Sequence, residues 1–453
     1  YIETLDGYTI SSKKVGEELW WYYAINDNGK LKPSEIVVSY IESPPNFSYK
    51  LKPEYVERVI SNELPPLRLA SNSRVKTIKP LIILVDFLDN SPTTNHQYTK
   101  EEFSELIFEE NLSSSDLPFS YQMSVRDYYK EASNGGIIIE GSSESIIDWL
   151  TIPENYSYYV DNNQGLGSGE GGIEKSAKAA LVHAMQLIDL DISKFDGDDD
   201  GVCDLIIMIM EGSDTGDSNQ FWSFKGALGY GDASTISPSS PTLNQELIYD
   251  GVVIRNFIVT TETIYHSDGA NYSSGDIRPI GTICHEIGHV LGLPDLYDTS
   301  ESSAPGIGDW GLMGTGNWNN QVSPSLFCSW SSSRLGLINL VSLDNLNSDN
   351  MIIEPIHLSD VAYKLNIGNE QTGEYILLEN RLAVGTDSYL KAEGLLVWHI
   401  DERLTGTFPM YNEVNIYKDF YGVKLLEAGG TDHLSSESGL IYWVVFGAPV
   451  VAI

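Results

Sequence analysis

One stretch decides how this chain is organised: Cys284-His285-Glu286-Ile287-Gly288-His289-Val290-Leu291-Gly292-Leu293-Pro294-Asp295-Leu296-Tyr297-Asp298. On an α-helix, His285 and His289 stand one turn apart on the same face, so both imidazoles can reach one metal ion. Glu286 lies one residue further round that helix. This offset suits a carboxylate that contacts the metal's water and not the metal itself, so the pattern indicates a zinc helix with Glu286 as general base.

A turn and a third candidate ligand follow the two histidines. Gly292 favours the left-handed backbone conformation that ends helices, and Pro294 cannot continue a helix. The chain must therefore turn at this point. After the turn, Asp295, ten residues past His285, can return to the metal as a third ligand and leave the fourth position for water.

A third constraint comes from the segment Gly308-Asp309-Trp310-Gly311-Leu312-Met313-Gly314-Thr315-Gly316, a small-residue turn with a methionine at its middle. The short pattern His-Glu-x-x-His occurs by chance in many helices, so the extended pattern and this turn carry the argument. Together they resemble a metzincin with its Met-turn, and more narrowly the M6 family of secreted peptidases, the immune inhibitor A type. The resemblance implies a secreted zinc metallopeptidase in which Met313 supports the metal site without binding the ion.

A second candidate metal site is the acidic loop, residues 196–204, which reads Asp196-Gly197-Asp198-Asp199-Asp200-Gly201-Val202-Cys203-Asp204. The carboxylates of Asp196, Asp198, Asp200 and Asp204 and the carbonyl of Val202 have the spacing that wraps a calcium ion. The glutamate of an EF-hand is absent, and M6 members show a similar short loop that leads into a strand. The alternative is an exposed acidic turn without an ion. We expect structural calcium, because so many carboxylates repel one another without a cation.

Composition and charge limit the function classes. The chain has 453 residues, 42% of them hydrophobic, and a net charge of -37 from 64 acidic and 27 basic side chains. This length predicts several globular domains, and the charge argues against nucleic acid or an anionic membrane as a partner. No stretch is long and apolar enough to predict a membrane span. The three cysteines, at wide spacing, imply no disulfide framework.

Three regions are expected along an α+β chain. Residues 1–75 contain strand and turn patterns and resemble the pro-region that precedes M6 catalytic domains, although an ordinary packed hairpin would look the same. Residues 76–344 form the metzincin-like catalytic domain, with a mixed sheet, the zinc helix and the Met-turn. Residues 345–453 alternate short strands with turns and predict a β-rich C-terminal domain. The sequence starts at Tyr1 without an apolar leader, so we expect any export signal to have been removed.

Within the catalytic region, apolar periodicity and capping residues predict further elements. We expect strands at 79–87, 137–139, 205–210 and 252–259, and helices at 99–111, 124–132, 173–188, 280–291 and 325–335. Three other side chains were weighed as site residues. Tyr297 is a weak candidate for stabilising the oxyanion, while His183 and His266 are expected to be ordinary packing or loop residues.

The function predicted from these patterns is zinc-dependent hydrolysis of peptide bonds in extracellular proteins, by a monomer. Zinc held by His285, His289 and Asp295 activates a water, and Glu286 takes its proton. Two alternatives remain from the sequence alone. One is a non-cleaving extracellular adhesion or binding protein on a metallopeptidase fold, against which the intact Glu286 argues. The other is a latent zymogen, blocked by residues 1–75. That block would need a carboxylate or steric cover, because no cysteine precedes residue 203.

Overall fold

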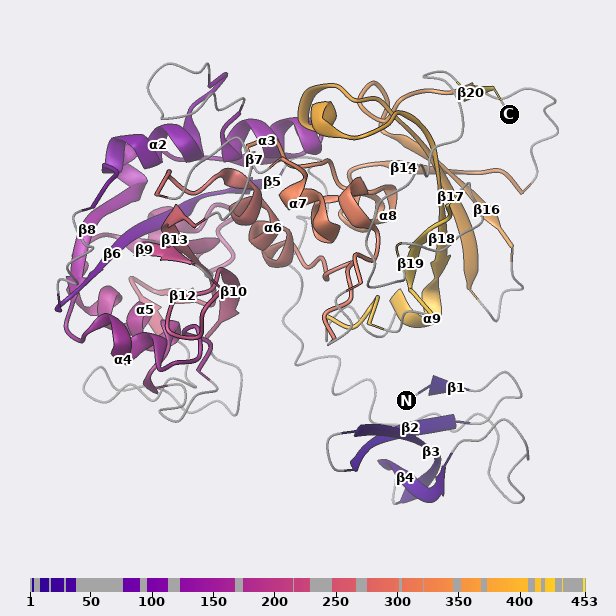
Figure 1. Ribbon diagram of the computed structural model, residues 1–453, viewed down its shortest axis with the longest axis horizontal. Coiled ribbons are helices and arrows are strands. Elements are labelled where there is room, and N and C mark those ends of the chain that lie inside the picture. The colour runs from indigo at the N-terminus through magenta and orange to yellow at the C-terminus, as the bar shows by residue number, and fades with distance from the viewer. Residues whose placement is uncertain are drawn as a thin grey trace. The chain divides into compact units, whose positions relative to one another are not determined.

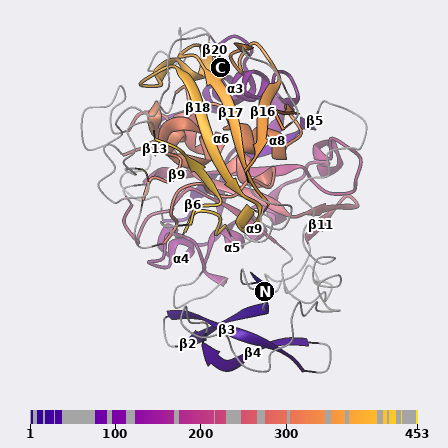
Figure 2. The same cartoon turned by 90° about the vertical axis from the view of Figure 1, so that its right-hand side faces the viewer.

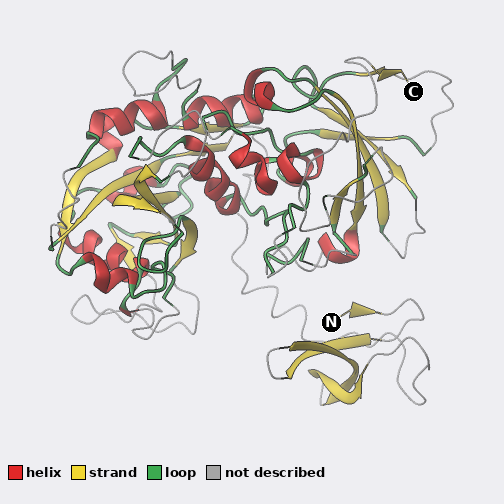
Figure 3. Cartoon of the chain, in the orientation of Figure 1, coloured by secondary structure: helices red, strands yellow, loops and turns green. Residues whose placement is uncertain are grey.

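The structure is a computed structural model in which the chain divides into two compact units, Tyr1–Pro66 and Leu67–Ile453. It has a mixed α+β architecture with several sheets (Figures 1 and 3). None of the helices in the described part of the chain is long and apolar enough to cross a membrane. The structure describes residues 2–3, 9–15, 18–27, 30–37, 76–89, 96–112, 123–167, 174–214, 216–228, 247–265, 275–300, 304–320, 322–344, 352–367, 373–405, 412–416, 420–427, 434 and 451–452.

The first unit contains an antiparallel sheet of four strands in the order β1-β2-β3-β4. β1 and β2 pair with Ile2 opposite Ile10. The aromatic run Trp20-Trp21-Tyr22-Tyr23, which predicts a strand, lies inside β3. Residues 61–73, whose Pro, Ser and Asn content predicts a linker, lie outside the described residues. The strands are β1 (Ile2–Glu3), β2 (Thr9–Val15), β3 (Glu18–Asp27) and β4 (Lys30–Val37).

The second unit is built on a five-stranded sheet in the order β10-β13-β9-β6-β8. Neighbouring strands run parallel except β10, which pairs antiparallel with β13 at one edge of the sheet. The expected apolar strand at 79–87 is β6, which is buried over nearly its whole length, as in parallel sheets covered on both faces. The strands are β6 (Pro80–Phe87), β8 (Ile146–Ile152), β9 (Leu205–Asp214), β10 (Phe224–Ala227) and β13 (Asn256–Ile264).

Helices cover both faces of this sheet. Because side chains alternate along a strand, Leu81 and Ile83 of β6 pack into the core under α5, while Ile82 and Leu84 pack into the core beside α6. Figure 1 shows α4 and α5 below the sheet and α2 and α3 above it. The helices are α2 (Lys100–Phe108), α3 (Val125–Ala132), α4 (Tyr156–Val160), α5 (Ala177–Leu187) and α6 (Ile280–Val290).

Caps and tertiary contacts set where the helices begin and end. Thr99 caps α2 in a reciprocal capping box with Glu102, which satisfies two backbone donors at the helix start. The helix is shorter than the predicted 99–111, because at Glu109 the backbone becomes extended and its carbonyl accepts a hydrogen bond from Ser124 Oγ. That same Ser124 side chain caps α3 through the backbone N–H of Asp127.

A second sheet forms the C-terminal part of this unit, in the order β14-β16-β17-β18-β19 (Figure 2). Its apolar residues Leu377 and Trp398 belong to the same core as Ile283 of α6 and Leu312 of the Met-turn. The predicted boundary near residue 345 stays a prediction. The elements are β14 (Asn339–Ser342), β16 (Val361–Asn366), β17 (Glu374–Arg381), β18 (Gly394–Asp401), α9 (Glu402–Thr405) and β19 (Val423–Leu425).

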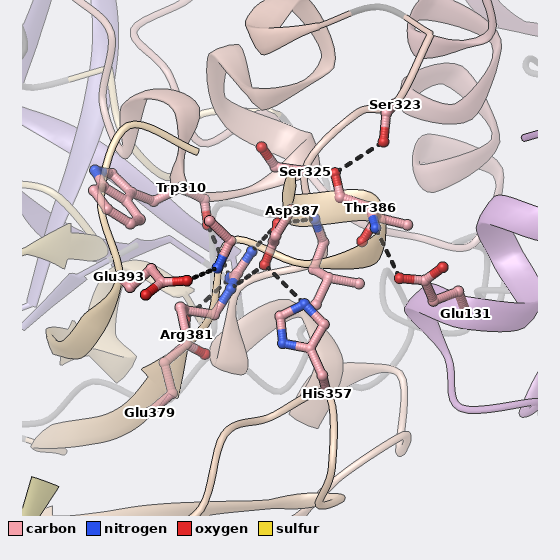
Figure 4. A network of polar contacts seen from close by, with 12 residues as sticks. Glu131, Trp310, Ser323, Ser325, His357, Glu379, Arg381, Thr386, Asp387 and Glu393 are labelled. Atoms are coloured by element: carbon pink, nitrogen blue, oxygen red, sulfur yellow. Dashed lines mark hydrogen bonds and ion pairs between the residues drawn. The ribbon is translucent and has the colours of Figure 1, made fainter. Parts of the chain in front are cut away.

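A buried polar network ties this sheet to the Met-turn (Figure 4). Arg381 of β17 donates two hydrogen bonds of 2.6 Å to Asp387 and one of 3.2 Å to Glu379. All three side chains are fully buried. Arg381 also donates to the Trp310 carbonyl, and Asp387 accepts from the backbone N–H of Leu326. Because these charges are paired and hydrogen-bonded, removing one partner would leave an uncompensated buried charge.

Other predicted elements also differ from the structure. The strand expected at 252–259 is two strands, β12 (Val252–Ile254), which forms a hairpin with β11 (Leu247–Tyr249), and β13. The helix expected at 325–335 is only α8 (Ser329–Arg334). The residues just before it are used elsewhere: the Leu326 N–H donates to Asp387, and the Ser325 hydroxyl donates to the Asp309 carbonyl.

The remaining short elements connect these layers. Strands β5 (Lys76–Ile78) and β7 (Ile137–Ile139) pair in parallel, and β15 (Ile352–Ile353) pairs antiparallel with β20 (Val451–Ala452). The helix expected at 173–188 begins only at Ala177, where α5 starts. Helix α7 (Asn317–Asn319) directly follows the Met-turn.

Candidate metal centre

Helix α6 carries the candidate metal ligands and has well-defined ends. It begins after Pro279, which occupies the N-cap position, and ends with Leu291 as the C-cap. Gly292 follows with φ of +90°. Its N–H donates to the His289 carbonyl, and the Leu293 N–H donates to the Gly288 carbonyl, which is the Schellman arrangement that closes a helix. The chain therefore turns back toward the helix, as its sequence predicts.

The turn brings Asp295 to the two histidines. Asp295 Oδ1 lies 2.9 Å from His285 Nε2 and 3.3 Å from His289 Nε2. One candidate ligand atom from each of the three side chains falls within 4.8 Å of the others. We call these residues the His-His-Asp cluster. His285 and Asp295 are buried, and His289 is half-buried.

Backbone carbonyls fix the orientation of both imidazoles. His285 Nδ1 lies 2.9 Å from the Leu312 carbonyl oxygen and His289 Nδ1 lies 2.8 Å from the Leu293 carbonyl oxygen. A carbonyl only accepts, so each Nδ1 must donate its proton there, which leaves Nε2 of each neutral imidazole with a lone pair directed at Asp295. Two lone pairs and a carboxylate oxygen then converge, an arrangement that needs positive charge between them. The donor set of two nitrogens and one oxygen fits zinc with an open fourth position.

The electrostatics agree with this need for a cation. Burial alone would raise the pKa of Asp295, but His289 and His285 hold that pKa well below its usual range. Burial likewise would lower the pKa of His289, but Asp295 and Glu286 outweigh it and raise the pKa to about 9. The cluster therefore stabilises positive charge, even when that charge is only the proton on an imidazole.

Glu286 lies beside the cluster but is not one of its members. Its side chain is buried, and this burial raises its pKa, against the opposing effect of His289 and His285. The backbone N–H of Lys225, on the edge strand β10, faces the Glu286 carboxylate. A carboxylate with a raised pKa next to a metal site has the properties of a general base.

The Met-turn packs directly against the metal helix. A Cβ on Gly288 would lie 2.5 Å from Met313 Sδ, so only glycine permits this approach without displacement of Met313. The Met-turn also supplies the Leu312 carbonyl that orients His285, and the Met313 carbonyl accepts from the Leu296 N–H. Met313 is almost fully buried and lies beneath the helix as packing.

Tyr297 lies over the cluster. Its ring stacks against His285, with centroids 6.2 Å apart and planes 30° apart. Burial and the nearby Asp295 and Glu286 raise the pKa of its hydroxyl well above the usual range. Its suggested role at the oxyanion stays a prediction. His266 lies outside the described residues, and His183 contacts the Tyr159 hydroxyl at 2.7 Å, away from the cluster.

A residue that the sequence did not single out contacts the third ligand. Asn412 donates from Nδ2 to Asp295 Oδ2 and accepts from the Asp295 backbone N–H at Oδ1, both at 2.5 Å. The two residues are 117 positions apart. No local pattern marks Asn412, and a lone asparagine in a loop is too common to signal a metal site.

The acidic loop brings together only part of its expected ligand set. Asp196, Asp198 and Asp204 each offer a carboxylate oxygen within 4.8 Å of the others. Asp200 is not among them, and its carboxylate accepts from the Val202 N–H at 2.8 Å within the loop. The predicted roles of Asp200 and of the Val202 carbonyl stay predictions, as does the calcium site itself.

Hydrogen bonds already hold the carboxylates of this loop. Asp196 accepts from the backbone N–H groups of Asp200 and Gly201. The buried Asp204 accepts from those of Gly197 and Lys79. Burial raises the pKa of Asp204 to about 6, against the lowering by these two backbone donors. The loop is thus closed by its own backbone.

Lys76 supplies positive charge near the acidic loop. Its ammonium is buried, and within the described part of the chain it has no hydrogen-bond partner. Burial lowers the pKa of Lys76 to about 8, while the nearby Asp204, Asp198 and Asp200 raise it. A lysine at this position competes with a metal ion for the same carboxylates.

A sheet with helices on both faces, a histidine-bearing helix and a His-His-Asp cluster beside a free glutamate together define the metallopeptidase class. The chain belongs to the M6 peptidase family. The family model described as immune inhibitor A peptidase M6, catalytic domain, matches residues 68–206 and 211–336, more than half of the chain. The match covers the five-stranded sheet, the acidic loop, the metal helix and the Met-turn, and it ends before the second sheet.

Two relatives are each similar over more than half of this chain. Immune inhibitor A of Bacillus thuringiensis subsp. alesti is 27% identical over 305 residues, which are 59% of this chain and 40% of that protein. The pre-pro-metalloprotease PrtV of Vibrio cholerae serotype O1 is 25% identical over 297 residues, which are 57% of this chain and 30% of that protein. The chain spans less than half the length of these relatives.

Proposed function

We propose that the protein is a secreted zinc-dependent endopeptidase. The observation that carries this proposal is the convergence of two oriented Nε2 atoms and Asp295 Oδ1 on one point, with Glu286 beside them and outside the ligand set. Membership of a metallopeptidase family supports it. His285, His289 and Asp295 would hold the metal. When bound, zinc acts as a Lewis acid that polarises the scissile carbonyl and activates water for attack.

The protein's own residues provide the proton transfers and the binding surface. Glu286 takes the proton of the attacking water on a carboxylate oxygen and transfers it to the leaving nitrogen. Burial raises the pKa of the Glu286 carboxyl group. This pKa therefore lies closer to the pH at which Glu286 must both accept and donate a proton. Strand β10 lies at the edge of the sheet next to this glutamate, so an extended peptide can pair with its backbone and present a bond to the cluster.

Digestion of an unstructured protein such as casein tests the proposal. We expect cleavage that a zinc chelator stops and added zinc restores. Glu286→Gln should lower kcat by about 10²- to 10⁴-fold, the usual contribution of general base catalysis, while the protein still binds one equivalent of zinc. Equal cleavage by Glu286→Gln, or cleavage that chelation leaves unchanged, would contradict the mechanism. Zinc binding without any cleavage would instead support a non-cleaving binding protein.

A role for the N-terminal unit as a pro-region is part of the same proposal. Residues 1–66 form a compact unit of their own with an antiparallel sheet, and the Vibrio relative is named a pre-pro-metalloprotease. Limited proteolysis that separates this unit, followed by the casein assay, tests the idea. A rise in activity on cleavage supports latency, and unchanged activity contradicts it.

The acidic loop is proposed to bind structural calcium through Asp196, Asp198 and Asp204. Three carboxylates within reach of one point support this, and calcium prefers such oxygen ligands. Extracellular calcium concentrations and the net charge of -37 fit an enzyme that acts outside the cell. Isothermal titration of the chelator-treated protein with calcium tests it, and no measurable binding at millimolar calcium would contradict it.

A further inference from the structure

Asn412 lies in the C-terminal region that carries the second sheet. Among the described residues of that region, it is the one whose side chain hydrogen-bonds to the His-His-Asp cluster. It lies between α9 and β19, and the family match ends at residue 336. Its amide makes a reciprocal pair with Asp295: Nδ2 donates to Asp295 Oδ2, and Oδ1 accepts from the Asp295 N–H. Such a two-point contact fixes both the position and the rotation of the carboxylate.

The two oxygens of Asp295 thus have separate partners. Oδ1 faces His285 Nε2 and His289 Nε2, and Oδ2 receives the amide of Asn412. A partial rotation of the carboxylate about χ2 would break the amide contact and turn Oδ1 away from the histidines. The hydrogen bond therefore holds the plane of the carboxylate, so that one oxygen faces the histidines and the other is engaged by the amide.

We propose that Asn412 is a positioning residue for the metal centre, which holds Asp295 as a single-oxygen ligand and strengthens zinc binding through it. The proposal rests on the proposed zinc site. Partners that hydrogen-bond metal ligands commonly change metal affinity by about 10- to 100-fold when removed. The partner must be a neutral donor, because a second carboxylate at position 412 would repel Asp295.

The fold around Asn412 holds it rigidly at this place. Its backbone has φ of +57°, a left-handed conformation that asparagine tolerates better than most residues. The Thr299 hydroxyl donates to its carbonyl at 3.3 Å. Three residues on, the fully buried Asn415 donates to the carbonyls of Leu296 and Val423 and accepts from the Val423 N–H. This segment therefore joins the strand β19 to the loop that carries Asp295.

Two substitutions separate positioning from simple loop anchoring. Asn412→Gly keeps the backbone conformation and removes both hydrogen bonds. Asn412→Asp also tolerates this conformation and keeps an acceptor for the Asp295 N–H, but it replaces the donor with a negative charge. Thr299→Ala is the matched control, because it removes a contact to the same loop without touching Asp295. Each variant is measured as the full chain.

The readouts are zinc affinity, by competition with a chromogenic chelator, and the visible absorption spectrum of the cobalt-substituted protein, with the thermal midpoint of the metal-free form alongside. We expect zinc to bind about 10- to 100-fold more weakly to Asn412→Gly, and at least as weakly to Asn412→Asp. Both should shift the cobalt spectrum. Thr299→Ala should bind zinc within twofold of the unaltered protein.

The outcomes distinguish this inference from the proposed function. If the unaltered protein binds no zinc, the zinc site itself is wrong. If it binds zinc and both Asn412 variants bind equally well, the positioning role is wrong. A lowered thermal midpoint of the metal-free Asn412→Gly with unchanged zinc affinity and cobalt spectrum would likewise overturn it, because that result describes a loop anchor only. An Asn412→Asp variant that binds zinc normally would also overturn it.

Discussion

The two clusters of candidate metal ligands in this protein differ in what their side chains already bind. In the His-His-Asp cluster, backbone carbonyls occupy the outward Nδ1 atoms and leave the inward Nε2 atoms facing a carboxylate. In the acidic loop, backbone N–H groups already occupy Asp196 and Asp204, and Lys76 lies nearby. The first cluster requires a cation to be stable, whereas the second is largely satisfied by its own backbone.

This difference is the one expected between the proposed catalytic centre and the proposed structural site. A catalytic metal needs rigid ligands and an open position, and orientation by neighbouring hydrogen bonds provides that rigidity. A structural ion needs only to add to a loop that folds around it. Each of the following predictions changes one of the two clusters and has a matched control variant.

The largest effect is expected from His289→Ala. This change leaves two protein ligands in place of three, so we expect loss of zinc at micromolar concentrations and of casein cleavage down to the uncatalysed background. Metal analysis and the casein assay measure both. Asp198→Ala, in the acidic loop, is the control and should retain full cleavage at the same temperature. Cleavage by zinc-free His289→Ala protein would contradict a catalytic role for the His-His-Asp cluster, and with it the contrast between the two clusters.

A smaller effect, on stability, is expected from Asp204→Ala. The half-buried backbone N–H groups of Gly197 and Lys79 lose their acceptor, so the free energy of unfolding should fall by about 2 kcal/mol. Urea unfolding in the presence of a calcium chelator measures it. Asp198→Ala, whose side chain is exposed, should change this free energy by less than about 0.5 kcal/mol. Equal losses in both variants would show that the backbone contacts of Asp204 contribute little.

The smallest effect is expected from Lys76→Met. Removal of a buried positive charge next to Asp204 and Asp198 should strengthen calcium binding by about tenfold. Calcium titration by calorimetry measures it, with Lys130→Met, an exposed change on α3, as control. Weaker calcium binding in Lys76→Met would mean that the lysine organises the loop for the ion. The acidic loop, like the His-His-Asp cluster, would then depend on neighbouring groups that orient its ligands.

The local features of the metal helix could be predicted from the sequence because they depend on spacing along the chain. One helical turn places His285 and His289 on one face, and Gly292 with its left-handed backbone returns the chain to them. Each step involves neighbours within about ten residues. The pairing of Thr99 and Glu102 at the start of α2 was predictable for the same reason.

Long-range contacts explain what the sequence could not show. Asn412 comes to Asp295 only because the second sheet shares a core with the metal helix. The helix predicted from residue 325 begins only at Ser329, and just before it the Leu326 N–H is bound by the distant Asp387. In the acidic loop, the spacing predicts Asp200 as a ligand, and its carboxylate also accepts from the Val202 N–H.

Asn412 and Asp295 contact each other but lie far apart in the sequence, and this separation has a consequence for biosynthesis. Translation proceeds from the N-terminal end, so the ribosome adds Asp295 117 residues before it adds Asn412. At common rates of protein synthesis this interval lasts roughly 6 to 23 seconds. During that time a nascent chain carries both histidines and the aspartate without the amide that orients it. If Asn412 positions Asp295 as proposed, the metal centre would be completed only after residue 412 has been synthesised.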